Sequence, residues 1–409
     1  MNFGAFMPLS FDNTEFAFAY KSDKELRKAR FLFATMGIDW LVKLGLKLTP
    51  WFIKARIPIN DLIRNTIFKQ FVGGESLQET SKVARTLAGF DVKVILDYGV
   101  EGKEGEENFE SITEEFIRVI EYAGSQPNIP FISIKLTGFV RFALLEKLDA
   151  AADETSGVQG RVKENILDDK ERAEWERVKS RLYRICETAQ ANKVSVLIDA
   201  EETWIQDPVD ALTMQMMLEF NKERAVVYNT IQLYRWDRLQ FLKDSYEWAN
   251  EKNVFLAIKI VRGAYMEKER RRALEKNYRS PIQVDKNSTD KDYNEAIEFC
   301  IDRLEKLFLV VASHNEYSNL YSTQLLNQHK FSHGHPHIHF SQLYGMSDNI
   351  TFNLAKEGFS VSKYLPFGPL KDVVPYLMRR AQENSSISGQ TGRELSLIKN
   401  ELRRRAAKK

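Results

Sequence analysis

The stretch Phe255-Leu-Ala-Ile-Lys-Ile-Val261, followed directly by Arg262-Gly-Ala264, decides the predicted fold. It is a β-prone apolar run that one lysine interrupts, and it ends at a charged residue and a glycine. Continuous apolar runs, in contrast to alternating ones, are typical of parallel strands that helices cover. We therefore expect a buried parallel strand here, with charged groups near its carboxyl end.

Similar β-rich runs recur from residue 90 onward, and they number eight: Val92–Leu96, Pro130–Leu136, Val194–Asp199, Val226–Leu233, Phe255–Val261, Leu307–Ser313, His337–Gln342 and Phe359–Leu365. Charged segments of helical period lie between them: Ser111–Ala123, Asp168–Ala191, Pro208–Arg224, Trp236–Lys252, Asp290–Lys306 and Tyr317–His329. This alternation predicts an α/β fold, a (β/α)8 barrel. A doubly wound open sheet is the rival, but it usually has fewer strands and a glycine-rich first turn, and the chain has neither G-x-G-x-x-G nor G-x-x-x-x-G-K.

The composition is that of an ordinary globular protein, with 43% hydrophobic and 28% charged residues among 409. A net charge of +2 gives no reason to expect nucleic acid. Cys186 and Cys300 lie far apart, which implies no disulfide framework and favours a reducing, cytoplasmic compartment. No apolar run reaches the roughly 18 residues that span a bilayer, and the N-terminus lacks the pattern of a secretory signal.

Residues 1–85 are predicted to form an N-terminal helical arm, and residues 86–409 the barrel. In the arm, Lys24–Leu48 and Pro58–Phe71 read as helical segments. From Lys24 to Lys69 there are ten basic and three acidic residues, interleaved with aromatic and aliphatic ones such as Trp40 and Trp51. Such an arm can make peripheral contact with anionic lipid at the inner face of a membrane. Alternatively, its apolar face packs on the barrel.

Polar or charged residues stand at the carboxyl end of nearly every predicted strand, which is the rim where barrel enzymes hold their chemistry. Burying such groups unpaired would cost on the order of several kcal/mol each, so a packed barrel has no use for them. A shared ligand explains their repetition better than separate structural roles. They are Lys135, Asp199, Glu201, Glu202, Gln232, Lys259, Arg262, Ser313, His314, Asn315, Gln342 and Tyr364.

A last block runs from Tyr364 through Pro366 and Gly368 to the adjacent Arg379 and Arg380. The strand-like run is expected to stop at Pro366, and a helix follows in which Pro375 is acceptable only in the first turn. Two planar guanidinium forks suit a carboxylate or a phosphate, although a solvated arginine pair is the alternative.

Taken together, these motifs resemble the proline dehydrogenase family over about residues 90–405. The matching motifs are Ser-Ile-Lys135-Leu-Thr, Ile-Asp199-Ala-Glu-Glu, Ile-Gln232-Leu-Tyr, Lys259-Ile-Val-Arg262-Gly-Ala-Tyr, Ala-Ser313-His314-Asn315, Gln342-Leu-Tyr-Gly-Met346 and Tyr364 with Arg379-Arg380. The resemblance implies a distorted (β/α)8 barrel with its last helix across the barrel top. It also implies bound FAD, with oxidation of L-proline to Δ1-pyrroline-5-carboxylate by hydride transfer from C5 to flavin N5. The electrons would pass to a quinone, as the first step of proline catabolism to glutamate.

The same resemblance implies roles for individual residues. Asp199 and Lys259 would lie at the catalytic centre, with Lys259 beside the flavin N5 edge. The substrate would contact Lys135, Tyr364, Arg379 and Arg380. The cofactor would contact Gln232, Arg262, Gly263, Ala264, Ser313, His314, Asn315, Gln342 and Glu383.

Two features depart from common family patterns. The fifth-strand motif is Lys-Ile-Val-Arg, whereas many bacterial members have Arg-x-Val-Lys, so the charges are exchanged. No aldehyde dehydrogenase module follows, so the enzyme that oxidises glutamate semialdehyde is expected to be a separate chain.

Four alternatives stay open at this point. Hydroxyproline is the first, although the Tyr364 phenol would crowd a C4 hydroxyl. A folate-reducing flavin barrel and a non-catalytic barrel are the second and third. A metal site at the histidines of residues 329–339 is the fourth, but no carboxylate or cysteine stands among them at ligand spacing, so no metal is expected.

Overall fold

The computed structural model of the chain describes the following residues: 9–38, 60–99, 104–152, 158, 162–386 and 390–408. The predicted lipid-facing arm around Trp40 and Trp51 lies outside these ranges. Among the described residues, no helix is long and apolar enough to cross a bilayer.

Eight strands form a closed barrel in sequence order, β1 to β8. The predicted runs are confirmed to within two residues at each end, because each run contains enough apolar positions to be buried. The bounds are β1 Lys93–Tyr98, β2 Phe131–Ile134, β3 Ser195–Ile198, β4 Val227–Gln232, β5 Leu256–Val261, β6 Leu307–Ala312, β7 Ile338–Leu343 and β8 Val361–Phe367. The fold class is therefore a (β/α)8 barrel.

Parallel pairing sets which strand ends lie side by side. Ile134 at the end of β2 pairs with Ile198 at the end of β3, and Gln232 at the end of β4 pairs with Val261 at the end of β5. All residues of β2, β3 and β4 are buried, as continuous apolar runs predict. The polar residues that follow these strands are consequently brought to one edge of the sheet.

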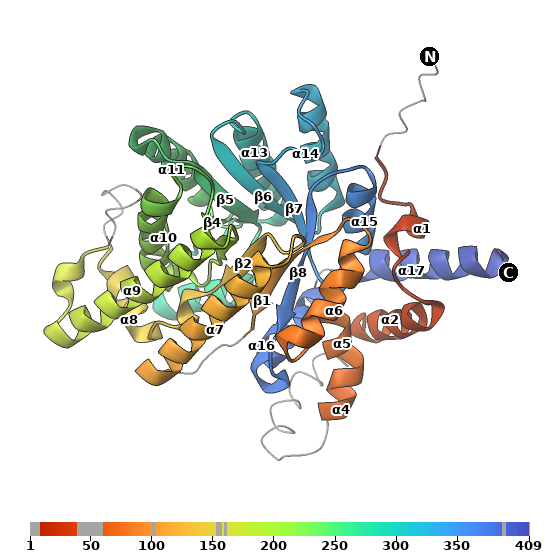
Figure 1. The fold of residues 1–409 in the computed structure, drawn as a ribbon, viewed down its shortest axis with the longest axis horizontal. Helices are drawn as coiled ribbons and strands as arrows, with labels where there is room; N and C mark the ends of the chain where they lie inside the picture. Colours follow the sequence, from red (N-terminus) through yellow and green to blue (C-terminus); the bar gives the residue numbers. More distant parts are fainter. Residues whose placement is uncertain are drawn as a thin grey trace. The chain divides into compact units, whose positions relative to one another are not determined.

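The chain divides into two compact units, and residues 95–340 form the larger one. Its helices alternate with the strands, as Figure 1 shows for α9, α10 and α11 beside β4. Their bounds are α7 Glu106–Gly124, α8 Phe142–Ala150, α9 Asp169–Ala191, α10 Gln206–Phe220, α11 Arg238–Lys252, α12 Met266–Lys276, α13 Lys286–Ile301 and α14 Glu316–Gln328.

Two of these helices differ from expectation. The helical segment predicted at Ser111–Ala123 begins earlier than expected, since α7 starts at Glu106, after Gly105 with φ 113°. Glutamates in its first turn suit the positive end of the helix dipole, which explains why an acidic stretch is helical here. The helix α12 was not predicted, because most of its residues are charged and its few apolar residues do not form a clear helical repeat.

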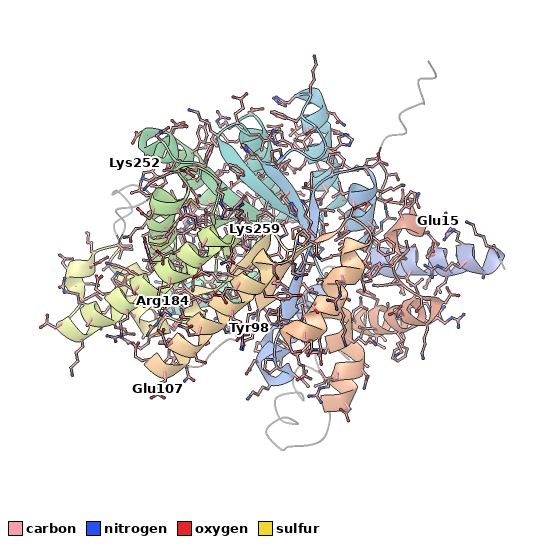
Figure 2. The ribbon with its side chains drawn as sticks, in the orientation of Figure 1. Glu15, Tyr98, Glu107, Arg184, Lys252 and Lys259 are labelled. Atoms are coloured by element: carbon pink, nitrogen blue, oxygen red, sulfur yellow. The ribbon has the colours of Figure 1, made fainter. Side chains whose placement is uncertain are left out.

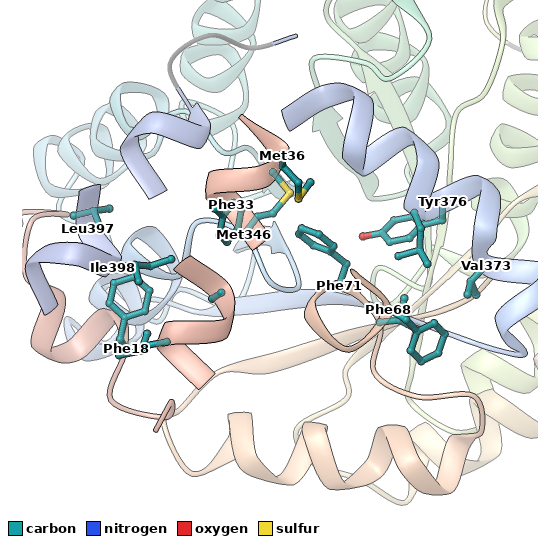
Figure 3. Close-up of a cluster of buried hydrophobic side chains, with 14 of the residues drawn as sticks. Phe18, Phe33, Met36, Phe68, Phe71, Met346, Val373, Tyr376, Leu397 and Ile398 are labelled. Carbon is teal, nitrogen blue, oxygen red and sulfur yellow. The ribbon is translucent and has the colours of Figure 1, made fainter. Parts of the chain in front are cut away.

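The second unit consists of residues 1–94 and 341–409. Its described elements are α1 Thr14–Ala17, α2 Asp23–Met36, α4 Asn60–Ile63, a π-helical turn Arg64–Phe68, α5 Lys69–Phe71, α6 Leu77–Ala88, α15 Asp348–Lys356, α16 Leu370–Ser386 and α17 Gln390–Ala407. Figure 3 shows the buried cluster that joins them. Phe33 of α2, Phe71 of α5, Tyr376 of α16 and Leu397 of α17 belong to it, so both ends of the chain share one core.

The prolines of the last block are placed differently from the prediction. The strand β8 does not stop at Pro366 but continues to Phe367, and the Pro366 carbonyl accepts a hydrogen bond from the Gly73 N–H at 2.8 Å. Pro375 lies in the second turn of α16 and not in the first. Its missing N–H would have bonded the carbonyl of Lys371, so α16 forms with one backbone hydrogen bond fewer.

A buried ionic network ties α17 to the rest of this unit. The Asp348 carboxylate accepts hydrogen bonds from Tyr20 and Lys21, and it lies 2.9 Å from the fully buried Lys363 ammonium. Burial alone would raise the pKa of Asp348, but the two ammonium groups lower it to about 2. Glu394 of α17 accepts the Ser347 N–H just before α15. Burial raises the pKa of Glu394 to about 7, and the charge of Asp348 adds to the rise.

We predict that the variant Glu394→Gln will lose less unfolding free energy than the parent as the pH rises from 5 to 8. A carboxyl whose pKa rises on folding stabilises the fold below its unfolded pKa, and that stabilisation is lost as the pH rises through the folded pKa. Between pH 5 and 8 the variant should therefore gain on the order of 2–3 kcal/mol of unfolding free energy relative to the parent. Urea titrations at both pH values measure the difference.

Glu401 on the same helix is the matched control. Burial would raise its pKa, but hydrogen bonds with Arg404 and Arg405 lower it, so Glu401→Gln should lose stability at neutral pH. A difference between Glu394→Gln and the parent that does not change with pH would contradict the assignment.

Candidate functional site

Three predicted residues meet at the carboxyl ends of β2, β3 and β5. The Asp199 carboxylate, one residue after β3, accepts a hydrogen bond from the Lys259 ammonium of β5. The Lys135 ammonium, one residue after β2, lies 3.5 Å from the other carboxylate oxygen. Figure 2 shows Lys259 among the strands, and its side chain is 5% exposed. An ammonium buried this deeply requires a carboxylate partner, which Asp199 supplies.

Two residues that the sequence analysis did not select complete this central network. Asp97 of β1 accepts a hydrogen bond from Lys135 at 3.5 Å, and Ser133 of β2 donates to Asp199 at 2.5 Å. Two carboxylates thus face two ammonium groups in this network. Asp97 had a signal in the sequence, since it is the one charge inside the apolar run Val94–Leu96 and Tyr98.

Asp199 is held in its ionised form. Burial alone would raise its pKa, but the charges of Lys259 and Lys135, with hydrogen bonds from Lys259 and Ser133, hold the pKa well below its usual range. The carboxylate therefore keeps its charge throughout the physiological pH range, next to the ammonium groups of Lys259 and Lys135.

Gln232 is the last residue of β4. The nitrogen of its side-chain amide has a hydrogen-bond partner, whereas the oxygen has none in the described part of the chain. Its Nε2 atom donates to the Glu201 carbonyl at 2.9 Å. Its Oε1 atom is buried, and no group in the described part of the chain donates to it. A buried acceptor without a donor is costly, so this atom marks a place where a ligand N–H would be favourable.

Arg262, directly after β5, is fixed on several sides. Its guanidinium donates to Asp290 at 2.7 Å, to Ser313 at 2.9 Å and to Ser318 at 3.0 Å. The ring of Tyr293 lies 4.2 Å from the guanidinium carbon. The structure thus brings the predicted Arg262 and Ser313 together, and a pre-oriented planar cation of this kind suits phosphate oxygens.

Gly263 follows Arg262 with φ 135°, a conformation that side chains rarely adopt. A Cβ atom here would lie 2.5 Å from the ring of Tyr234, so any side chain would force the ring to move. Gly263 and Ala264 are both exposed, which leaves their backbone N–H groups open to a ligand.

The turn after β6 carries three predicted residues. Ser313 accepts a hydrogen bond from the Asn315 N–H at 3.1 Å, and Asn315 caps α14 by accepting from the Ser318 N–H at 3.1 Å. His314 lies between them and is partly buried. Asn315 therefore has a structural role here, whatever else it contacts.

The remaining predicted residues belong to the unit made of residues 1–94 and 341–409. Gln342 of β7 accepts from Thr351 at 2.8 Å, and Tyr364 of β8 is 9% exposed. Arg379 and Arg380 lie next to each other on α16, where the guanidinium of Arg380 lies over the ring of Tyr376. Arg380 is buried, which argues against a solvated pair. The side chain of Glu383 lies outside the described part of the chain.

Comparison with known proteins identifies the family. The model of the proline dehydrogenase family matches residues 80–393. "Proline dehydrogenase 1, mitochondrial" of Dictyostelium discoideum is 31% identical over 96% of this chain and 74% of its own length. "Hydroxyproline dehydrogenase" of Xenopus laevis is 29% identical over 95% of this chain and 88% of its own.

A solved structure shares the fold. It is proline utilization A from Bdellovibrio bacteriovorus, inactivated by N-propargylglycine, with a TM-score of 0.71 and 18% identity. The similarity covers 97% of this chain but only 42% of that longer protein. On the family match and these relatives, this chain belongs to the proline dehydrogenase family and is an oxidoreductase that acts on proline.

Proposed function

We propose that the enzyme oxidises L-proline to Δ1-pyrroline-5-carboxylate with FAD as its cofactor and passes the electrons to a quinone. The observation that carries the proposal is the central network, in which Asp199 holds the buried ammonium of Lys259 among the strands. A buried ammonium at the carboxyl end of the barrel strands can stabilise negative charge that develops in a redox reaction.

The residues present suit a bound flavin. Gln232 offers an unpaired buried acceptor to a ring N–H, and Arg262 with the exposed backbone of Gly263 suits a pyrophosphate. Held by these residues, FAD would supply the hydride acceptor for C5 of proline. Ser313, His314, Asn315 and Gln342 are proposed to lie along the cofactor, and Glu383 is proposed there from the sequence motif alone.

The chain's own residues bind and orient the substrate. Arg379, Arg380 and Lys135 are proposed to neutralise its carboxylate, and Tyr364 to pack against its ring. Lys259, fixed by Asp199, places a positive charge where electron density develops. Asp199 is not assigned as a base, because its low pKa makes it a poor proton acceptor.

The product and the location belong to the same proposal. Hydrolysis of the product gives glutamate semialdehyde, which a separate dehydrogenase would oxidise. We place the enzyme in the cytoplasm with peripheral contact at the inner face of the membrane, where a lipid-dissolved quinone is found. The boundary between arm and barrel at residue 85 stays a prediction.

One experiment tests the cofactor and the substrate of this proposal. The flavin spectrum of the purified protein is titrated anaerobically with L-proline, trans-4-hydroxy-L-proline and NADPH in parallel. Proline should bleach the flavin at the lowest concentration. Bleaching by NADPH alone would favour a folate-reducing flavin enzyme, and a colourless protein would favour a non-catalytic barrel.

Hydroxyproline is the second candidate substrate, because the hydroxyproline dehydrogenase of Xenopus laevis is among the relatives. We predict that Tyr364→Ser will lower kcat/KM for proline and raise the hydroxyproline-to-proline ratio, since the ring occupies the space that a C4 hydroxyl needs. Tyr364→Phe keeps the ring and should leave the ratio near that of the parent. An unchanged ratio in Tyr364→Ser would remove this residue from the specificity role.

Arg379→Met and Arg380→Met are each predicted to weaken proline binding by about 2–4 kcal/mol, the usual loss for a buried charge-assisted pair. Steady-state KM and flavin content measure the two effects, and the flavin should stay bound. Arg403→Met on α17, where the side chain is exposed, is the matched control. A parental KM in both α16 variants would exclude the carboxylate clamp.

Gln232→Leu is predicted to weaken flavin binding by about 1–3 kcal/mol, because it removes the acceptor that the ligand N–H would use. The dissociation constant of FAD, measured by fluorescence on the apoenzyme, reports this without turnover. Gln232→Glu keeps an acceptor and should retain more of the affinity. Equal affinity in Gln232→Leu and the parent would place the flavin elsewhere.

A further inference from the structure

One face of the helix α13 holds Arg262, the residue that follows β5. Residues at the spacing i, i+4, i+7 and i+8 lie on the same side of a helix, and here they are Lys286, Asp290, Tyr293 and Asn294. Asp290 and Tyr293 contact Arg262 itself, whereas Lys286 contacts Asp290, and Asn294 contacts a serine that binds Arg262. A helix outside the predicted cofactor contacts therefore sets the position of one of them.

The plane of the guanidinium is fixed by three hydrogen bonds and one ring. Its Nε–H donates to the Asp290 carboxylate at 2.7 Å, and its terminal nitrogens donate to the Ser313 and Ser318 hydroxyls at 2.9 and 3.0 Å. The ring of Tyr293 lies 4.2 Å from the guanidinium carbon. A guanidinium has five N–H groups, and these bonds use three. The other two have no acceptor in the described part of the chain, and because the fork is planar, the bond at Nε sets where they point.

Tyr293 also fixes α13 to the barrel. The helix contacts β5 and β6, between which its label stands near in Figure 1. The Tyr293 side chain is fully buried, and its hydroxyl lies 3.2 Å from the Ile260 carbonyl of β5 and 3.2 Å from the Ala312 carbonyl of β6. The helix face that holds Arg262 is thus tied to the ends of the two strands that carry Arg262 and Ser313.

The Asp290 carboxylate is shared by two cations. One oxygen accepts from Arg262, and the other accepts from the Lys286 ammonium, one turn earlier on α13. Burial would raise the pKa of Asp290, but hydrogen bonds with Lys286 and Arg262 lower it, so the carboxylate is ionised at neutral pH. One carboxylate between two cations leaves one positive charge. Asp290 can therefore orient Arg262 without cancelling its attraction for an anion.

We infer that Asp290 is a positioning residue for the FAD pyrophosphate: it orients Arg262, while Lys286 restores the positive charge that this pairing would remove. The role rests on the proposed function, in which the anion that Arg262 binds is the pyrophosphate of FAD. By charge alone, a carboxylate beside this site would weaken the binding of an anion. Positioning has the opposite sign, so the loss of the carboxylate should weaken FAD binding although it removes a negative charge.

Binding of FAD and of riboflavin to the full-length apoenzyme, measured by flavin fluorescence, tests this role without turnover. Asp290→Ala should weaken FAD binding by about tenfold, because Arg262 loses its orienting bond. Riboflavin has no phosphate, so its binding should stay at the parental level. Asp290→Asn keeps an oxygen that accepts the Nε–H and should lie between Asp290→Ala and the parent.

The salt dependence separates orientation from charge. Lys286→Gln should weaken FAD binding by about threefold at low salt, and the loss should disappear at high salt, because the side chain is exposed and acts only through its charge. The loss in Asp290→Ala should persist at high salt. Lys291→Gln and Glu295→Gln remove the charges of an exposed pair on the same helix, and both should bind FAD like the parent.

A double-mutant cycle checks that Asp290 acts through the arginine. In an Arg262→Met background, Asp290→Ala should change FAD affinity by less than about twofold. Parental or tighter FAD binding by Asp290→Ala would overturn the role, and so would additive losses in the cycle or equal losses for FAD and riboflavin. A parent that binds no FAD would instead overturn the proposed function, and this role with it.

Discussion

The contact between Lys259 and Asp199 is the constraint on which the site depends. A closed parallel barrel pairs its backbone groups strand to strand, so its interior offers no backbone partner to a buried ammonium. The cation must be balanced by a side chain from another strand, and Asp199 after β3 provides it. The Lys135 ammonium forms ion pairs with the second carboxylate oxygen of Asp199 and with the Asp97 carboxylate. Four residues, each in a strand or one position after it, are thereby joined in one ionic network.

Much of the architecture could be predicted from the sequence because barrel strands are buried on both faces. A buried run such as Val226–Leu233 can be recognised from its own apolar residues, without knowledge of the segments that pack on it. All eight strands were predicted in this way. A helix after the last strand was predicted and is α16, but Pro375 lies in its second turn, since a helix can lose one hydrogen bond when packing holds it. The helix α12 was missed because Leu274 and Met266, its apolar positions, face water and give no core period.

In the candidate site, too, some residues could be predicted from the sequence and others could not. Residues at strand ends were predictable, since the rim of a barrel gathers them whatever the loops do. Ser133 and Asp97 were not selected, because a serine inside a strand is common and a single aspartate has no partner visible in the sequence. The unsatisfied Gln232 oxygen and the Tyr234 ring against Gly263 are geometric facts, which only coordinates provide. The family assignment fixes the enzyme class, while the role of each residue rests on the experiments above.

Arg405 of α17 has a consequence for how the chain is made. Its guanidinium donates to the carbonyls of Lys21 and Phe18 and to the Asp23 carboxylate, residues almost four hundred positions earlier. On a ribosome, α1 and α2 would emerge on the order of tens of seconds before Arg405 and the rest of α17. During that interval α2 can pack on Phe71 of α5, but the part of its apolar face that α17 covers has no native partner. The core of this unit is therefore completed only after α17 has been synthesised, and until then part of the apolar face of α2 stays exposed to other partners.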